Sequence, residues 1–184
     1  GGKHIRILGS QLVLRGSVML NIVRTSLGGT GQMIIATTSW IFLLRILASI
    51  GSEAVAGATI GIRIMMFTLM PAWGMSNAAA TLVGQNLGSQ QPERATAAVW
   101  RIGWYNMVFT LSVSVLFFFF HDRIVAIFSD DARVIAIGGE WLRILSYSYF
   151  VYGWWMVSVQ AYNGAGDTMT PTWINLVFFW MIQI

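Results

Sequence analysis

Long uncharged stretches alternate with short charged segments along the chain. Asp, Glu, Lys and Arg are absent from residues 25–44, 64–92, 102–120, 144–166 and 168–184. A helix of about 20 apolar residues can cross a hydrocarbon core about 30 Å thick, where only a closed, hydrogen-bonded backbone is tolerated. The pattern therefore predicts an all-α fold, a polytopic transmembrane helical bundle.

The limits of the uncharged stretches place the predicted helices. We expect transmembrane helices over residues 28–50, 55–84, 102–120 and 144–162, and a truncated one over residues 173–184. Pro71 lies at the centre of the second helix, where it removes one backbone hydrogen bond and clashes with the Phe67 carbonyl, so we expect a kink. The small residues Gly74, Ala78 and Thr81 of the same helix predict a close helix contact.

Residues 1–27 differ from the rest of the chain because they carry bases without acids. The bases are Lys3, Arg6, Arg15 and Arg24. Apolar residues recur between them at helical spacing, which favours a cytoplasmic amphipathic helix at the headgroup level over a plain linker. The excess of bases sets this orientation and places the acid-rich connection 121–143 outside. The chain lacks an initiator Met and stops within an apolar run, so we interpret it as an internal segment of a longer protein.

Composition narrows the function classes. Hydrophobic residues make up 56% of the chain and charged residues 10%, with a mean hydropathy of +0.66, whereas soluble domains carry about 25% charged residues. Cysteine is absent, which excludes disulfides and thiolate metal sites. His4 and His121 have no Cys or acid at metal-ligand spacing, so we expect no enzyme activity, metal or cofactor. Basic side chains without aromatic interleaving argue against a nucleic-acid partner.

One face of the second predicted helix carries side chains that suit a binding cavity. Met66, Met70, Trp73 and Asn77 follow one another at spacings of four, three and four residues, which places them on one face of a helix. Thioethers adapt to varied apolar ligands, and an indole face attracts organic cations. Ordinary helix packing is the alternative, because membrane helices contain many such stripes.

The fourth predicted helix carries a comparable face with Tyr149, Tyr152, Met156 and Gln160 at spacings of three, four and four residues. Phenol and amide groups in hydrocarbon need hydrogen-bond partners, so these side chains should face either other helices or a watery cavity. Arg63, about two turns into the second helix, could serve a substrate or ion pathway. We favour the alternative, in which it snorkels outward or pairs with Glu53. The predicted cavity lining is therefore Met66, Met70, Trp73, Asn77, Tyr149, Tyr152 and Gln160.

Several motifs resemble those of one family of membrane proteins. They are GSEAVAGATIGIRI at residues 51–64, PAWG at 71–74, TLVGQNLG at 81–88, PERA at 92–95 and QAYNGAGDT at 160–168, with Pro171 after the last. Together they are similar to the MATE (multidrug and toxic compound extrusion) transporters over most of the chain. The last motif is similar to the family's turn between its tenth and eleventh helices.

The resemblance implies a fold and a function. It implies twelve helices in two lobes related by pseudo-symmetry, of which this chain is a partial second lobe, helices 7 to 11, beside a missing first lobe of the same chain. It also implies a multi-pass protein of the inner cell membrane, with the lipid bilayer and a small organic molecule as partners. Such a protein is a secondary active antiporter that exports organic cations or other toxic small molecules, in exchange for protons or sodium ions, by alternating access.

The coupling ion and two other functions stay open. Residues 25–44 hold no acid, and Tyr152 lies about where a sodium-type subgroup has its second acid, so the resemblance favours a coupling acid in the missing lobe. A lipid-linked oligosaccharide flippase of the same superfamily is one alternative, although its cavity should be rich in bases, and the helix faces here offer only Arg45 and Arg63. A non-transporting membrane scaffold subunit is the other.

Overall fold

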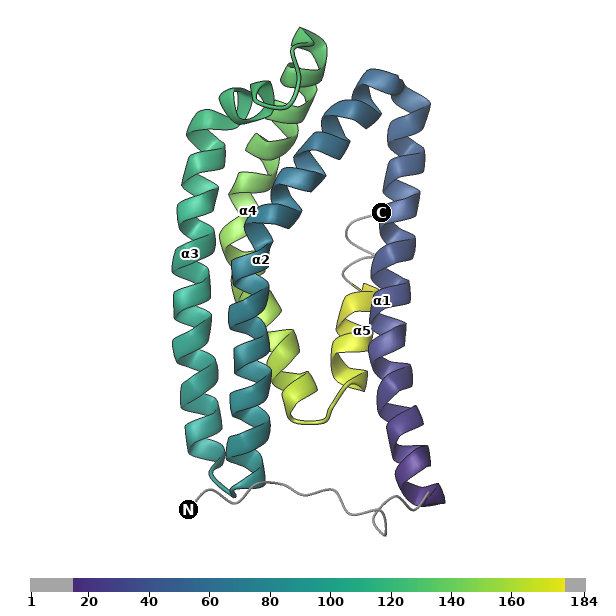
Figure 1. Cartoon of the computed structure of the whole chain (residues 1–184), viewed down its shortest axis with the longest axis vertical. Coiled ribbons are helices and arrows are strands. Elements are labelled where there is room, and N and C mark those ends of the chain that lie inside the picture. The colour runs from purple at the N-terminus through teal and green to yellow at the C-terminus, as the bar shows by residue number, and fades with distance from the viewer. Residues whose placement is uncertain (1–14, 178–184) are drawn as a thin grey trace, which may run out of the picture.

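The computed structural model describes residues 15–177, and it confirms the all-α prediction for them. The helices are α1 (Gly16–Ile50), α2 (Ser52–Gly88), α3 (Pro92–Ala126), α4 (Ala132–Gly164) and α5 (Met169–Val177). Consecutive helices run in opposite directions along the long axis of the molecule (Figure 1). Short connections allow no other arrangement, since α1 and α2 are joined by Gly51 alone. Its φ of 147° is one that favours glycine.

The described helices α1, α2 and α3 are long and apolar enough to cross a membrane. The predicted span 144–162 lies inside α4, which is 33 residues long but does not reach the same mean hydropathy. Charged residues in its first half, such as Glu140 and Arg143, and Tyr, Trp and Ser in its second half explain the difference. These polar groups suit a helix that packs between others.

The helices extend beyond the predicted spans, because backbone hydrogen bonding in a helix does not depend on the hydropathy of its side chains. The predicted spans 55–84 and 102–120 correspond to the longer helices α2 and α3. The separate amphipathic helix expected for residues 1–27 is corrected in its described part. From Gly16 onwards these residues belong to α1, which runs without a break into the span expected at 28–50. Residues 1–14 and 178–184 of the predicted segments lie outside the described residues.

The core lies between α2, α3 and α4, where glycines let the helix backbones approach closely. A methyl group added to Gly164 would lie 2.3 Å from the Ala80 carbonyl oxygen, and one added to Gly103 would lie 2.4 Å from the Trp154 ring. The predicted contact at Gly74, Ala78 and Thr81 is not found within the described chain, because a Cβ atom added at Gly74 would meet no other part of it within 4 Å and the other two residues are exposed. These small residues lie on the side of α2 that faces away from α3 and α4.

Two helices depart from a straight course. Pro71 lies inside α2, and Figure 1 shows α2 changing direction near its middle, as the sequence predicts. In α3, Phe120 leaves helical geometry with φ −123° and ψ 15°. The final turns of α3 are therefore set at an angle to the rest of the helix, near the connection to α4.

The expected ion pair between Arg63 and Glu53 does not form. Glu53, at the start of α2, pairs instead with Arg133 of α4, with 3.2 Å between Oε1 and Nη1. The starts of α2 and α4 lie side by side, so Arg133 is near Glu53. Arg63 is farther away, because it lies almost three turns along α2. Arg63 stays exposed and has no ion pair with any residue of the described range.

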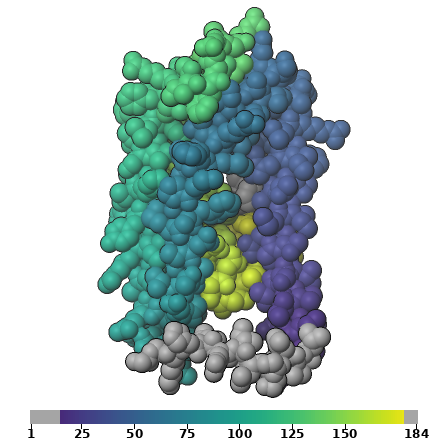
Figure 2. Space-filling view, viewed as in Figure 1, coloured from purple at the N-terminus to yellow at the C-terminus, as the bar shows by residue number. Residues whose placement is uncertain are grey.

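Helices α1 and α5 form a second unit beside the three-helix core. Gly28 of α1 contacts Thr168, and the Thr172 hydroxyl donates a 3.0 Å hydrogen bond to the Gly28 carbonyl. Figure 2 shows the molecule hollowed between α1 and α2, with later parts of the chain at the back of this hollow. We call this feature the hollow below.

Candidate functional site

The predicted stripe on α2 lies outside the core. Met66, Met70, Trp73 and Asn77 are all exposed, and Trp73 is 61% exposed. The core face of the same helix contains other residues, such as Leu69 and Ala72. Packing within the described chain therefore does not account for this stripe. Its role in lining a cavity stays a prediction.

Tyr149 departs from the expectation that it lines a cavity. Tyr149 is only 1% exposed. Its hydroxyl lies 2.6 Å from the Thr68 hydroxyl and donates to the Met65 carbonyl oxygen at 3.3 Å. Its ring packs 5.3 Å from that of Phe117. Tyr149 thus joins α2, α3 and α4, because it lies on the face of α4 that is buried against both helices.

Tyr152 lies on the flank of α4 instead. It is exposed, and its ring centroid is 5.0 Å from that of Trp155. Sequence spacing could not separate Tyr149 from Tyr152, because both recur at helical intervals and both are amphipathic. The structure places one in the core and the other at its edge.

Asn77 and Gln160, predicted separately on two helices, are brought together by a hydrogen bond. Gln160 Nε2 donates to Asn77 Oδ1, and Asn163 Nδ2 donates to Gln160 Oε1 at 2.8 Å. Gln32 Nε2 of α1 donates to Asn163 Oδ1 at 3.2 Å and to the Thr168 carbonyl oxygen at 3.0 Å. We call Gln32, Asn163, Gln160 and Asn77 the amide relay. It connects α1, α4 and α2.

Sequence reasoning missed two of the four relay residues. Gln32 is a strongly polar side chain inside an uncharged predicted span, and Asn163 belongs to the turn motif at residues 160–168. Each was a usable signal, since a polar group in hydrocarbon needs a partner. The missing information was which helices meet, because Gln32 and Asn163 are separated by 131 positions in the sequence.

The relay is fixed at one end by the turn before α5. Asp167 caps this helix by accepting hydrogen bonds from the Thr170 hydroxyl at 2.5 Å and from the backbone N–H groups of Thr170 and Met169. These hydrogen bonds lower the pKa of the Asp167 carboxyl, the Thr170 hydroxyl having the largest effect. The Thr168 carbonyl, which accepts from Gln32, is held between this cap and α1.

A second polar group, Asn106 of α3, lies in the core beside the proline of α2. It is fully buried. Its Nδ2 lies within hydrogen-bond distance of the Gly153 carbonyl at 2.9 Å, the Ser76 hydroxyl at 3.2 Å and the Ala72 carbonyl at 3.3 Å. Asn106 therefore connects three helices where α2 bends. No motif or spacing in the sequence marks Asn106 as a site residue.

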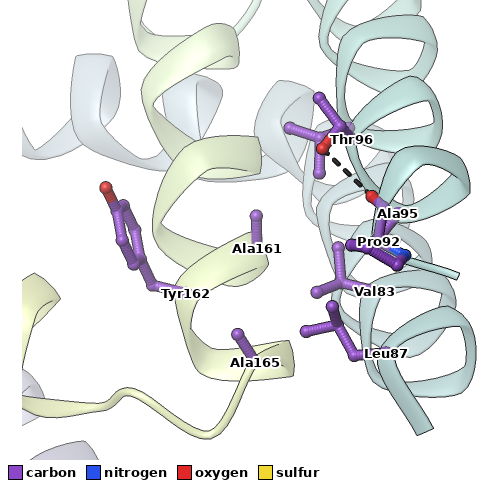
Figure 3. Close-up of a pocket in the computed structure, with 9 residues that line it drawn as sticks. Val83, Leu87, Pro92, Ala95, Thr96, Ala161, Tyr162 and Ala165 are labelled. Atoms are coloured by element: carbon purple, nitrogen blue, oxygen red, sulfur yellow. Dashed lines mark hydrogen bonds between the residues drawn. The ribbon is translucent and has the colours of Figure 1, made fainter. Parts of the chain in front are cut away.

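An apolar groove of about 240 Å³ lies near the end of α2. Figure 3 shows its lining, which comes from α2, α3 and α4 and consists mostly of aliphatic side chains. Thr96 donates its hydroxyl to the Pro92 carbonyl, so it offers little to a ligand. Binding sites usually combine apolar walls with convergent polar groups, and the relay fits that description better than this groove. Within residues 15–177 no cluster of His, Cys, Asp or Glu could hold a metal ion.

Long apolar helices, short turns and amide side chains bonded between helices define a multi-pass helical membrane protein. The MatE family model matches residues 30–184, so the chain belongs to this transporter family, as its motifs predict. This agrees with the membrane location expected from the uncharged stretches.

Curated relatives carry names that refer to transport. The chain is 28% identical over 164 residues to a probable multidrug resistance protein NorM of Thermotoga maritima, covering 89% of this chain and 35% of that protein. It is 27% identical over 134 residues to a FAD transporter of Shewanella oneidensis, covering 73% of this chain and 30% of that protein. The chain thus spans about a third of the length of these relatives.

A solved structure shares the fold. It is a MOP superfamily transporter from Pyrococcus furiosus, described as having a binding pocket of reverse polarity that suggests a different function. The TM-score is 0.80 at 15% identity, covering 86% of this chain and 35% of that one. At this identity the likeness supports the arrangement of helices alone.

Proposed function

We propose that this chain is part of the second lobe, helices 7 to 11, of a secondary active antiporter. The transporter exports organic cations or other toxic small molecules in exchange for protons or sodium ions. The observation that carries the proposal is the contact between Asn77 and Gln160 beside the exposed stripe of α2. This contact puts polar groups next to adaptable apolar ones, a combination typical of sites for organic ligands.

The stripe supplies the kinds of contact that a varied set of substrates needs. Trp73 offers a flat aromatic face, and Met66 and Met70 offer flexible thioethers. A ligand that contacts these groups in one lobe arrangement only will favour that arrangement, and a coupling ion that binds the other arrangement better will reverse the change. Exchange follows from the two opposed preferences.

The coupling group is proposed to lie outside this chain, in a first lobe. The acids of the described residues are Glu53, Glu93, Asp122, Asp130, Asp131, Glu140 and Asp167. All of them lie outside the predicted transmembrane spans. A proton or sodium ion carried through the membrane needs a carboxylate or an equivalent group at depth, and this chain offers none there.

Transport by the complete protein in liposomes tests the proposal. With a proton or sodium gradient imposed, uptake of aromatic dyes such as ethidium should depend on the gradient. Trp73→Ala should weaken dye affinity, whereas Trp104→Ala is a matched control because this tryptophan of α3 is exposed to a similar degree, 57%. Unchanged dye affinity in Trp73→Ala, with gradient-driven uptake intact, would contradict the assignment of the stripe.

Cysteine labelling separates a transporter from a membrane scaffold. The chain has no cysteine of its own, so in the complete protein, with any cysteine elsewhere replaced by serine, a single introduced thiol reports its own surroundings. Asn77→Cys should react with a water-soluble maleimide, and Ser76→Cys, at a fully buried neighbour, should not. Protection of both positions in the complete protein would favour the scaffold.

The flippase alternative has less support from the chain. A pyrophosphate group is best held by several bases acting together. Arg45 of α1 and Arg63 of α2 are exposed, but they lie on different helices and no further base accompanies them in the predicted spans 28–50 and 55–84.

A further inference from the structure

The hydrogen bonds of the amide relay all point in one direction. The Thr168 backbone carbonyl can only accept, so the atom of Gln32 that contacts it must be the donating Nε2. This nitrogen also contacts Asn163 Oδ1, which leaves Asn163 to donate through its own nitrogen to Gln160. Gln160 must then donate to Asn77. One backbone group thus assigns the oxygen and nitrogen of four side-chain amides, which otherwise are hard to tell apart.

The relay ends in unused donors. Asn77 Oδ1 accepts from Gln160, so the Asn77 amide nitrogen with its two N–H groups is the free end. No described residue accepts a hydrogen bond from this nitrogen, and Asn77 is exposed. Hydrogen bonds in a chain polarise one another. The free N–H groups of Asn77 are consequently stronger donors than those of an isolated asparagine.

The rest of this face of α2 also favours acceptors over donors. Arg63 lies on the same face as the stripe, one turn before Met66, and its positive charge is not neutralised by Glu53, which pairs with Arg133. No acid belongs to the stripe. The face therefore carries the Arg63 cation near one end and the polarised N–H groups of Asn77 near the other. At a rise of about 1.5 Å per residue, the two lie about 21 Å apart along the helix.

We propose that Asn77 binds a hydrogen-bond-accepting oxygen, a carbonyl or a carboxylate, on the transported molecule, while Trp73 and Met70 contact its apolar part. This inference rests on the proposed transport function and narrows its substrate class. A molecule with such an oxygen binds better than the same molecule without it. Gln32 acts as a positioning residue, because it sets the direction of the relay and hence which atom of Asn77 is free.

A pair of dyes tests the preference directly. One is a rhodamine with a free carboxylate on its pendant phenyl ring, and the other is the rosamine that lacks only this carboxylate. Fluorescence polarisation with the purified complete transporter in detergent gives the two dissociation constants. We expect the rhodamine to bind about tenfold tighter or more, because a hydrogen bond to a charged group is among the stronger kinds.

Asn77→Asp keeps the shape of the side chain and replaces its N–H groups by a carboxylate oxygen. The ratio of the two dissociation constants should reverse, so that the cationic rosamine binds tighter. Asn86→Asp is the matched control, because it adds the same charge to α2 at a residue whose side chain bonds only within its own helix, to the Leu82 carbonyl. Its ratio should equal that of the unaltered protein.

Gln32→Glu tests the direction of the relay from its far end. A carboxylate cannot donate to Asn163, so Asn163, Gln160 and Asn77 should each turn over and leave the Asn77 oxygen free. The dye preference should then fall below that of the unaltered protein, although the altered residue lies on another helix. A merely structural role of Gln32 would lower stability or weaken both dyes equally.

The outcomes separate this inference from the proposed function. Gradient-driven transport with equal affinity for both dyes, or an unchanged ratio in Asn77→Asp, overturns the inference and leaves the transport function standing. Failure of the unaltered protein to transport any dye under either gradient removes the proposed function itself. A reversed ratio in Asn77→Asp, with a normal ratio in Asn86→Asp, supports the inference.

Discussion

Replacing Gly164 by alanine should open the contact between α4 and α2. A Cβ atom at Gly164 would lie 2.3 Å from the Ala80 carbonyl oxygen and 2.7 Å from the Ala80 Cα atom. Both neighbours are backbone atoms of a long helix, so neither can turn aside as a flexible side chain can. The helices must separate, or the end of α4 must shift.

The size of the effect follows from the overlap. Ordinary contacts of a Cβ atom begin near 3.4 Å, so the two backbones would have to move apart by about 1 Å. Overpacking of this kind costs about 1–3 kcal/mol. Gly164 follows Asn163 directly, so the same shift should also lengthen the hydrogen bonds of the amide relay.

Gly74→Ala is the matched control, because no heavy atom lies within 4 Å of a Cβ atom at that position. Alanine in a helix interior is favoured over glycine by up to about 1 kcal/mol, so this variant should be neutral or more stable. The assay is the unfolding equilibrium of the purified protein in mixed micelles with increasing denaturing detergent, followed by circular dichroism. Equal stability of the two variants would refute the close-packing argument.

The remaining predictions concern one tyrosine and one aspartate. Tyr149→Phe should lower the free energy of unfolding by about 0.6–1.7 kcal/mol, from the average to the largest value measured for hydrogen bonds between membrane helices. It should leave dye affinity unchanged, because Tyr149 is buried. A clear loss of dye affinity would show instead that Tyr149 lines the cavity. Asp167→Ala should remove a pH dependence of stability. The pKa of Asp167 is lowered in the folded protein, so the charged carboxylate stabilises the fold at pH values above the unfolded pKa of about 3.9. This stabilisation is lost as the pH falls from the unfolded pKa through the lower folded pKa. Unfolding curves for the two proteins should therefore converge at low pH, and parallel curves would contradict the role of the cap.

The sequence predicted those features that depend on near neighbours. The uncharged stretches marked each helix, and Pro71 marked a change of direction in α2. Helix ends were less predictable, because Gly16 and Gly88 continue helices past the point where the hydrocarbon would end. Hydropathy reports the solvent around a helix, whereas the backbone hydrogen bonds that define its ends continue into the headgroup level.

The candidate site was only partly predictable, for a different physical reason. Spacing along one helix identifies a face, but it does not tell whether that face meets lipid, a helix or a cavity. Tyr149 and Tyr152 illustrate this, since one is buried in the core and the other is exposed. The relay depends on which helices meet. The role of Gln32 follows from its hydrogen bond to Thr168, more than a hundred positions away in the sequence.

The described helices divide into a three-helix core and the pair α1 and α5, and this division determines how easily the hollow between α1 and α2 can widen. In hydrocarbon, apolar helix faces gain no hydrophobic energy from meeting, so packing and hydrogen bonds alone decide which helices stay together. The core has close glycine contacts and the buried Asn106, whereas α1 meets the rest through Gly51, the Trp40 side chain packed against the core, α5 and the relay. Moving α1 and α5 away from α2 would therefore break few contacts, among them the packing of Trp40 and the single hydrogen bond between Gln32 and Asn163. The direction of the relay depends on the same hydrogen bond, so the ligand preference that we propose for Asn77 would change with the position of α1 through Gln32.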